Sequence, residues 1–223
     1  MKVGELWRYP VKSMRGERLP NVEIALDGIV GDRLVHVENK RGVVTARTHP
    51  RLLRFNATFG NDGDTFVDGL PWRDPRVRER VREEVGGDIR LVSSDGSVRF
   101  DVLPLLVATD GAVAAFGRDS RRLRPNVLVA EVNGLVEREW EGRGMMIGSV
   151  AIYLHSLRRR CVMTTYDPDT LEKDGEVLRD IQRRFGGVLA LNAVVLRPGL
   201  VHVGDPVRVL AHDETREILA AES

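Results

Sequence analysis

Short apolar runs recur along the whole chain and are separated by glycine, aspartate and asparagine, residues that favour turns. Runs of this length, bounded in this way, are typical of β-strands. The pattern predicts strands at Lys2–Tyr9, Arg33–Val37, Leu53–Phe59, Asp88–Val92, Asn126–Ala130, Val150–Leu154, Ala190–Leu196 and Val207–Ala211. So many short strands in one chain favour a β-barrel or a β-sandwich.

Helical patterns are the minority. The sequence predicts helices at Pro75–Val85, in the region Leu103–Phe116, and at Glu176–Phe185, where apolar residues recur at helical spacing. There is no internal repeat, low-complexity tract or flexible linker, so any two domains must be closely joined. We therefore expect a mainly β fold of the α+β class with peripheral helices.

Composition limits the possible partners. The chain has 223 residues, 42% of them hydrophobic, so it can bury a sizeable core. Its 34 Lys and Arg against 33 Asp and Glu give a net charge of +1, which provides no overall field for nucleic acid or a membrane surface. No stretch approaches the ~20 apolar residues that a membrane span requires. We expect a cytoplasmic protein that binds neither nucleic acid nor membrane, with any anion site being local.

The single cysteine limits the chemistry further. One thiol cannot close an intramolecular disulfide, and a single cysteine is typical of proteins from a reducing compartment. It also excludes an iron–sulfur cluster or a four-thiolate zinc site held by this chain alone. The common phosphate, acyl, zinc and dinucleotide motifs are absent. The histidines are scattered without ligand spacing: His36, His49, His155, His202 and His212.

Two charged segments have simple structural interpretations. RDPRVRERVREE, residues 73–84, mixes arginines with acids, which favours a solvated helix over a nucleic-acid site because the opposite charges cancel. GNDGDTFVDG, residues 60–69, lacks the spacing and terminal glutamate of a calcium loop. We expect a hairpin turn there.

The only cysteine, Cys161, lies in the segment LRRRCVMTTYDPDT directly after three arginines. If any of these arginines points the same way as the sulfur, its positive charge favours the thiolate over the thiol. The thiolate is both the nucleophilic and the metal-binding form of cysteine. The segment is therefore a candidate for nucleophilic or metal chemistry.

Three further polar clusters lie at the edges of predicted strands and helices. YPVKSMRG carries Lys12 and Ser13, DGIVGDR followed by VTARTHP carries Arg33 and Arg47, and RRLRPN carries Arg124 and Asn126. Pro125 predicts an extended conformation for Arg124. Taken alone, each residue fits an ordinary surface, turn or core role. Together, guanidinium groups, an ammonium, a hydroxyl, a carboxamide and a soft thiolate suit a ligand that carries phosphate, a heteroaromatic ring and a metal.

These clusters, in this order, resemble the MOSC family. YPVKSMRG and DGIVGDR…VTARTHPRL resemble the N-terminal β-barrel domain that precedes many MOSC domains, and RPN, RC..TT.DP.T and VGDPV resemble the MOSC domain itself. The resemblance implies a β-barrel-like domain over residues 1–95, packed on a MOSC β-barrel over residues 96–212, with a C-terminal tail at 213–223.

In pattern, the chain is similar to the amidoxime-reducing enzymes within this family. The resemblance implies that Cys161 ligates the molybdenum of a molybdopterin cofactor, with Arg160 beside it. It likewise implies that the pterin and its phosphate are held by Lys12, Ser13, Arg33, Arg124 and Asn126. The expected activity is reduction of a small N-hydroxylated or N-oxygenated substrate. The electrons would come from a separate ferredoxin-like or flavoprotein-like partner, because one cysteine cannot hold a cluster.

The sequence departs from that pattern in two ways and leaves two alternatives open. The chain is shorter than the bacterial counterparts that carry a C-terminal ferredoxin-like domain. Arg159, larger and charged, stands where these enzymes usually have a small serine. A low-pKa thiolate at Cys161 would also serve a sulfur carrier that transfers a persulfide. The third possibility is a carrier that binds the molybdenum cofactor without turnover.

Overall fold

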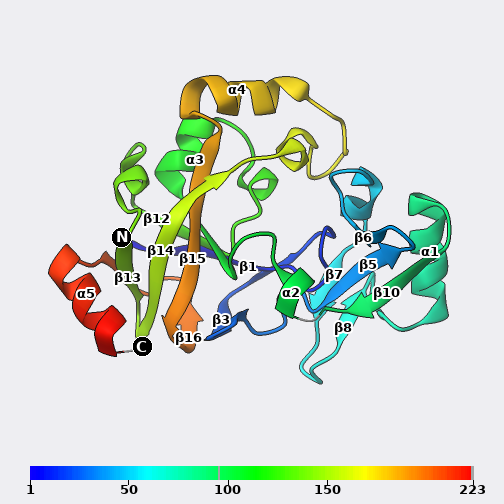
Figure 1. Ribbon diagram of the computed structural model, residues 1–223, viewed down its shortest axis with the longest axis horizontal. Helices are drawn as coiled ribbons and strands as arrows, with labels where there is room; N and C mark the ends of the chain where they lie inside the picture. The colour runs from blue at the N-terminus through cyan, green and yellow to red at the C-terminus, as the bar shows by residue number, and fades with distance from the viewer. Residues whose placement is uncertain (95, 222–223) are drawn as a thin grey trace.

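The computed structural model describes residues 1–94 and 96–221, and it shows a mainly β molecule in two parts. The larger part is built around one extended sheet, and the smaller part lies beside it at the other end of the long axis (Figure 1). The short helix α2 (Gly96–Arg99) lies where the two parts meet (Figure 1).

The larger part contains an eight-stranded sheet with the order β17-β13-β14-β15-β11-β12-β1-β2. Its strands are β1 (Lys2–Arg8), β2 (Glu17–Leu19), β11 (Leu105–Thr109), β12 (Val127–Ala130), β13 (Arg143–Ile147), β14 (Val150–Arg159), β15 (Val188–Arg197) and β17 (Val207–Val209). Lys2 also pairs with Pro206, and the Val3 N–H donates to the Asp205 carbonyl at 2.9 Å. Because the start of β1 is thereby bonded to the segment just before β17, the sheet curls round on itself like a barrel.

A second, three-stranded sheet adds to the core of this larger part. It has the order β16-β3-β4, with β3 at Asn21–Ala25, β4 at Gly28–Ile29 and β16 at Gly199–His202. Val22, Ile24 and Val201 pack into the same buried cluster as Leu6, Val107 and Ile152 of the large sheet, among others. The larger core therefore draws on both ends of the chain.

The smaller part has its own core under two three-stranded sheets. These have the orders β10-β5-β6 and β7-β8-β9. The strands are β5 (Val35–Asn39), β6 (Gly42–Val44), β7 (Ala57–Phe59), β8 (Thr65–Val67), β9 (Leu70–Pro71) and β10 (Ile89–Ser93). Val37, Leu52 and Val81 are fully buried in this cluster. The segment 60–69 contains the expected hairpin turn, between the paired strands β7 and β8.

Helix α1 (Pro75–Val85) covers this core and has the predicted boundaries. Asp74 caps it by accepting a hydrogen bond from the Arg76 N–H, Pro75 fills the first turn, and Gly86 follows with φ 79°. Each of these residues is typical of its position. The expectation of a solvated face is also met, because only Val77 and Val81 are buried.

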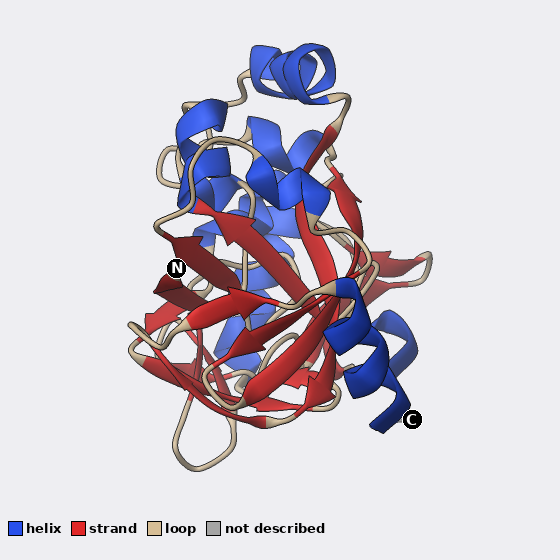
Figure 2. Cartoon of the chain, turned by 90° about the vertical axis from the view of Figure 1, so that its left-hand side faces the viewer, coloured by secondary structure: helices blue, strands red, loops and turns tan. Residues whose placement is uncertain are grey.

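The other helices lie around the larger part, most of them gathered beyond one end of its strands (Figure 2). They are α3 (Asp110–Phe116), α4 (Gly175–Phe185) and α5 (His212–Ala221). Phe116, Ile181 and Phe185 form a small buried cluster between α3 and α4. The segment after residue 212, expected to be a tail, contains α5. None of the described helices is long and apolar enough to cross a membrane.

Two predicted elements are wrong in their first half. The strand expected at Leu53–Phe59 begins only at Ala57, because Leu53 and Arg54 belong to a 3-10 helix, Pro50–Arg54. The region Leu103–Phe116 was expected to be helical, but Leu105–Thr109 forms β11, and only Asp110–Phe116 is helix. All five residues of β11 are buried, and the strand runs parallel to β12 and antiparallel to β15. A strand buried on both faces has a continuous apolar run, which periodicity alone cannot distinguish from a buried helix. The domain boundary near residue 95 stays a prediction.

Candidate functional site

A cleft of about 260 Å³ brings most of the predicted site residues together. Its lining includes Lys12, Ser13, Arg33, Arg124, Arg160 and Cys161. Arg47, Arg122, Arg158 and Arg159 also line it, and Asp101 is its acidic member. The two neighbouring strands β14 and β15 of the large sheet support one wall, and the loop after β1 supplies another. The surplus of guanidinium and ammonium groups makes the cleft a site for anions.

Cys161 follows the end of β14 and begins a 3-10 turn, Val162–Thr165. Its carbonyl accepts hydrogen bonds from the Thr164 N–H at 3.1 Å and from the Thr164 hydroxyl at 2.8 Å. The residue is half-buried and its thiol is free. Thr164 therefore fixes the backbone of Cys161 and leaves the sulfur available to the cleft.

The three arginines before Cys161 have different roles. Arg160 donates from Nη2 to the Leu123 carbonyl at 2.7 Å, but its Nε and Nη1 are buried without a hydrogen-bond partner among the described residues. Burial lowers the pKa of Arg160 to about 10, with a further contribution from the charge of Arg158. Arg159 is exposed at the rim of the cleft. A buried guanidinium with two unpaired N–H donors costs free energy, which favours binding of an anionic hydrogen-bond acceptor.

Arg158 is held beside the cleft by Asn192 and Asp101. Its Nη1 donates to the Asn192 Oδ1 at 3.2 Å, and its Nη2 lies 3.6 Å from the Asp101 carboxylate. Burial lowers the pKa of Arg158, and the nearby Asp101 and Cys161 partly offset this effect. Arg158 and Arg160 therefore place positive charge close to the Cys161 sulfur.

Arg33 and Arg124 flank the ring of Tyr9. The guanidinium carbon of Arg124 lies 4.2 Å from the ring centroid, and that of Arg33 lies 5.2 Å from it. Arg33 is ion-paired with Asp32, which is fully buried and also accepts the Tyr9 N–H at 2.7 Å. Arg124 has no side-chain hydrogen bond or ion pair within the part of the chain that the structure describes. Burial lowers its pKa to about 10.

The backbone at the cleft is strained at three predicted residues. Ser13, Arg33 and Arg124 have φ values of 70°, 52° and 56°, in the left-handed region that side chains rarely adopt. The extended conformation predicted for Arg124 from Pro125 is therefore wrong. The Arg124 N–H instead donates to the Arg121 carbonyl at 3.2 Å, which ends the preceding 3-10 turn and aims the side chain back over Tyr9. Strain of this kind concentrates at functional sites.

Asp101 is the site residue that the sequence did not reveal. Its carboxylate lies 2.9 Å from the Lys12 Nζ and 2.6 Å from the Arg47 Nη2. Burial would raise the pKa of Asp101, but the hydrogen bond and charge of Lys12, with the charges of Arg47 and Arg158, hold it below 3.8. Lys12 also donates to the Val98 carbonyl at 3.0 Å, which ties α2 to the cleft. A single acid between two apolar residues carries no sequence signal.

Asn126 is the one predicted binding residue that does not line the cleft. It is fully buried, its Oδ1 accepts the Leu106 N–H at 3.1 Å, and its Nδ2 donates to the Trp7 carbonyl at 3.3 Å. These bonds join β1 and β11 on either side of β12. Its carboxamide therefore holds together the strands that carry Tyr9 and Arg124 to the site. A binding role for Asn126 stays a prediction.

Comparison with family models assigns both regions of the chain. Residues 1–74 match the MOSC N-terminal beta barrel domain, and residues 112–208 match the MOSC domain. Among curated proteins, the chain is 25% identical to mitochondrial amidoxime-reducing component 1 of Homo sapiens, with 93% of this chain and 82% of that protein covered. It is also 31% identical over 98 residues to molybdenum cofactor sulfurase of Bombyx mori, which covers 44% of this chain and 12% of that protein.

A solved structure has the same overall fold. The YuaD protein from Bacillus subtilis aligns with a TM-score of 0.51 and 16% sequence identity. The alignment covers 93% of this chain and 94% of that one. At this identity, the likeness concerns the arrangement of the elements alone.

Proposed function

The chain belongs to the MOSC family, with a MOSC N-terminal β-barrel domain followed by a MOSC domain, and we propose that it is a molybdenum-cofactor oxidoreductase. Its substrates would be small N-hydroxylated or N-oxygenated compounds, in line with the amidoxime-reducing relatives. One observation carries the proposal: the free Cys161 lines the same cleft as Arg160, whose guanidinium has two buried N–H donors without a partner among the described residues.

The residues present fit such a cofactor. Arg160 has two buried N–H groups without partners, and Arg124 is a largely buried cation without a hydrogen bond among the described residues. Both would gain charge-assisted hydrogen bonds from a phosphate or from the polar edge of a pterin. The Cys161 sulfur is a soft ligand of the kind that suits a metal already bound by sulfur. The donor set of the cleft therefore matches the group.

In the proposed reaction, the chain binds and orients while the cofactor carries the redox step. Arg160 and Arg124 would hold anionic and polar groups of the cofactor, with Arg33 and Ser13 beside them. Cys161, which lines the cleft, would be the protein's ligand to the metal. When bound, the cofactor supplies the two-electron chemistry by which an N–OH group is reduced and its oxygen leaves as water. Each turnover consumes two electrons and two protons.

The electrons would come from a separate redox protein. A chain with one cysteine holds no iron–sulfur cluster of its own. We propose a ferredoxin-like or flavoprotein-like donor that docks near the cleft. The exposed Arg159 at the rim is a point where an acidic surface could make contact.

Replacing the proposed metal ligand tests the function. Cys161→Ser and wild type are produced with a supply of molybdenum cofactor, and molybdenum content, thermal stability and benzamidoxime reduction with an artificial electron donor are compared. We expect activity to fall at least about a hundredfold, since even partners outside the ligand set cost ~10–100-fold. The free energy of unfolding should change by less than about 1 kcal/mol. Arg118→Gln, an exposed change outside the cleft, is the control.

The same experiment separates the alternatives. Full activity in Cys161→Ser would refute the ligand role. Molybdenum in wild type without any reductase activity would favour a cofactor carrier. Wild type that carries no molybdenum but forms a persulfide on Cys161 with a cysteine desulfurase would favour sulfur transfer.

A further inference from the structure

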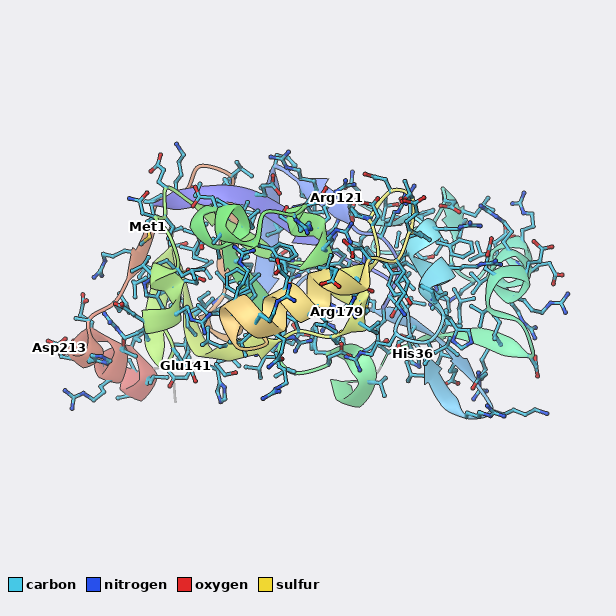
Figure 3. All side chains as sticks on the ribbon, turned by 90° about the horizontal axis from the view of Figure 1, so that it is seen from above. Met1, His36, Arg121, Glu141, Arg179 and Asp213 are labelled. Carbon is cyan, nitrogen blue, oxygen red and sulfur yellow. The ribbon has the colours of Figure 1, made fainter. Side chains whose placement is uncertain are left out.

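A second pocket lies beside the cationic cleft, and nothing in the proposed function uses it. It has a volume of about 220 Å³ and shares three lining residues with the cleft, Arg122, Arg124 and Met163. Its walls are formed by Trp7 and Tyr9 at the end of β1, by Leu53 and Asn56 of the smaller part, and by two segments of the larger part, residues 121–124 and 163–168. Figure 3 shows Arg121 about midway along the molecule. The pocket therefore adjoins the site that contains Cys161.

The walls of this pocket combine arginines with three aromatic side chains, Trp7, Tyr9 and Tyr166. Trp7 and Tyr9 are stacked, with ring centroids 6.4 Å apart and planes inclined by 13°. Leu53, Met163, Tyr166 and Pro168 complete the apolar lining. The volume lies below the ~300 Å³ at which pockets for drug-sized ligands begin. Flat walls and a small volume favour a ligand with a single planar ring.

Arg15 supplies an unsatisfied donor to the same pocket. Its Nε is buried and has no hydrogen-bond partner among the described residues, while its Nη2 donates to the Asp169 carbonyl at 3.0 Å. The Arg15 N–H and carbonyl also bond to the Phe55 carbonyl and the Ala57 N–H, which fix the backbone of the residue. A buried guanidinium N–H without an acceptor is costly unless a ligand supplies one, and an anionic oxygen is the best acceptor.

The other arginines of the pocket differ in how far they are neutralised. Arg121 is paired with Asp119 and Asp169, at 2.7 Å and 2.6 Å, and Arg122 is paired with Asp167 at 2.9 Å. Among the described lining residues, none is acidic. Arg15 and Arg124 are therefore the cations with donors to spare.

We propose that this pocket binds the non-reacting part of the substrate, a single aromatic ring that carries an acidic group. The proposal rests on the proposed function, because the ring would place its N–OH group toward the adjoining cleft. The acidic group pairs with Arg15, and the ring packs between the Trp7/Tyr9 stack and Tyr166. The pocket would thus select acidic aryl substrates over neutral ones of the same shape.

Binding to protein without cofactor tests the pocket independently of catalysis. The probes are 4-carboxybenzamidoxime and 4-methylbenzamidoxime, which share a shape but differ in charge. Titration calorimetry measures affinity, and quenching of tryptophan fluorescence reports contact, since Trp7 lines the pocket while Trp72 and Trp140 are buried in the two cores. We expect the carboxylate to bind at least about tenfold more tightly than the methyl compound, and Trp7→Phe to remove most of the quenching.

Arg15→Gln should abolish that preference while leaving the affinity for the methyl compound within about twofold. Arg15→Lys, which keeps the charge, should retain part of it. Arg51→Gln is the matched control, because Arg51 is 63% exposed and does not line the pocket. Thermal unfolding of each variant excludes loss of fold as the cause. Equal affinity of wild type for both probes, or an unchanged preference in Arg15→Gln, would overturn the proposal.

Kinetics with the cofactor-loaded protein separate this proposal from the proposed function. If the pocket selects the substrate, Arg15→Gln raises KM for the carboxylate about tenfold or more and leaves kcat nearly unchanged. A loaded protein that reduces neither amidoxime, while wild type without cofactor still prefers the carboxylate, would refute the proposed function but leave the binding site standing. Reduction of both compounds with equal KM would refute the pocket and leave the function.

Discussion

Arg124→Gln should stabilise the protein in the absence of cofactor and at the same time weaken cofactor binding. In the structure, Arg124 is a largely buried cation whose compensation is its contact with the Tyr9 ring, 4.2 Å away. Burial lowers its pKa from 12.5 to about 10. Because the group is charged in both the folded and unfolded states below pH ~10, the unfavourable burial is present throughout the physiological range.

The size of the effect follows from two opposing contributions. The fall in pKa from 12.5 to about 10 corresponds to roughly 3–4 kcal/mol that disfavours the folded cation. Loss of the contact with the Tyr9 ring removes about 1–2 kcal/mol of stabilisation. The net gain is about 2 kcal/mol, which for a protein of this size raises Tm by roughly 4–8 °C. Cofactor binding loses a charge-assisted hydrogen bond of about 1.5–3 kcal/mol, roughly a tenfold to hundredfold loss of affinity.

Two measurements on the same preparations check this reasoning. Scanning calorimetry gives Tm of the cofactor-free proteins, and molybdenum analysis after expression with limiting cofactor gives occupancy. Arg51→Gln, which removes an exposed arginine, should change neither. A clear fall in Tm together with undiminished molybdenum content in Arg124→Gln would show that Arg124 stabilises the fold and does not bind the cofactor.

Two further substitutions test the surroundings of the site. Asp101→Asn should lower the free energy of unfolding at pH 7 by about 1–2 kcal/mol, since Asp101 bonds to Lys12 and is only partly exposed. Because its pKa is held below 3.8, the stabilisation is present above that pH and is lost as the pH falls further. In urea unfolding, the free energy of unfolding should therefore fall less steeply with decreasing pH in Asp101→Asn than in wild type. The same acid dependence in both proteins would contradict a stabilising role for the Asp101 carboxylate. Gly16→Ala should cost about 1–3 kcal/mol, because a Cβ there would collide with the Arg8 carbonyl and the Tyr9 ring. Gly175→Ala, whose Cβ would meet only Arg179 at 3.8 Å, should be neutral or slightly stabilising, and equal effects of the two changes in thermal unfolding would refute the close approach.

Elements with local signals could be predicted from the sequence. Helix α1 has its capping aspartate, its first-turn proline and its terminal glycine within a dozen residues, so its boundaries follow from local chemistry. β11 could not be separated from α3 in the same way. Its identity as a strand depends on pairing with β12 and β15, whose residues are distant in sequence. Tertiary context decides such apolar segments.

The same difference between local signals and distant contacts explains which residues of the site could be predicted from the sequence. Cys161 and the arginines were found because they stand in dense polar clusters of the sequence. Asp101 was missed because its three cationic partners come from three separate segments. The backbone of Arg124 was mispredicted because Pro125 sets only a preference, which the hydrogen bond to Arg121 overrides. Most of the residues that line the cleft could thus be named from the sequence, but Asp101 and the contacts between the lining residues could not.

The position of β1 in the large sheet sets an order of events during synthesis. Its residues are synthesised before those of their partners, because β1 pairs with β2 nearby, with β12, and through its first residues with the segment before β17. The smaller core, by contrast, draws mainly on residues between Val11 and Ile89, with its neighbours close in sequence. Contacts that close long loops form slowly. The smaller part can therefore fold while β1 is paired with β2 alone, because β12 and the segment before β17 follow more than a hundred residues later. The cleft is lined by residues from Lys12 to Met163, so it becomes complete only after segments that lie far apart in the sequence have come together.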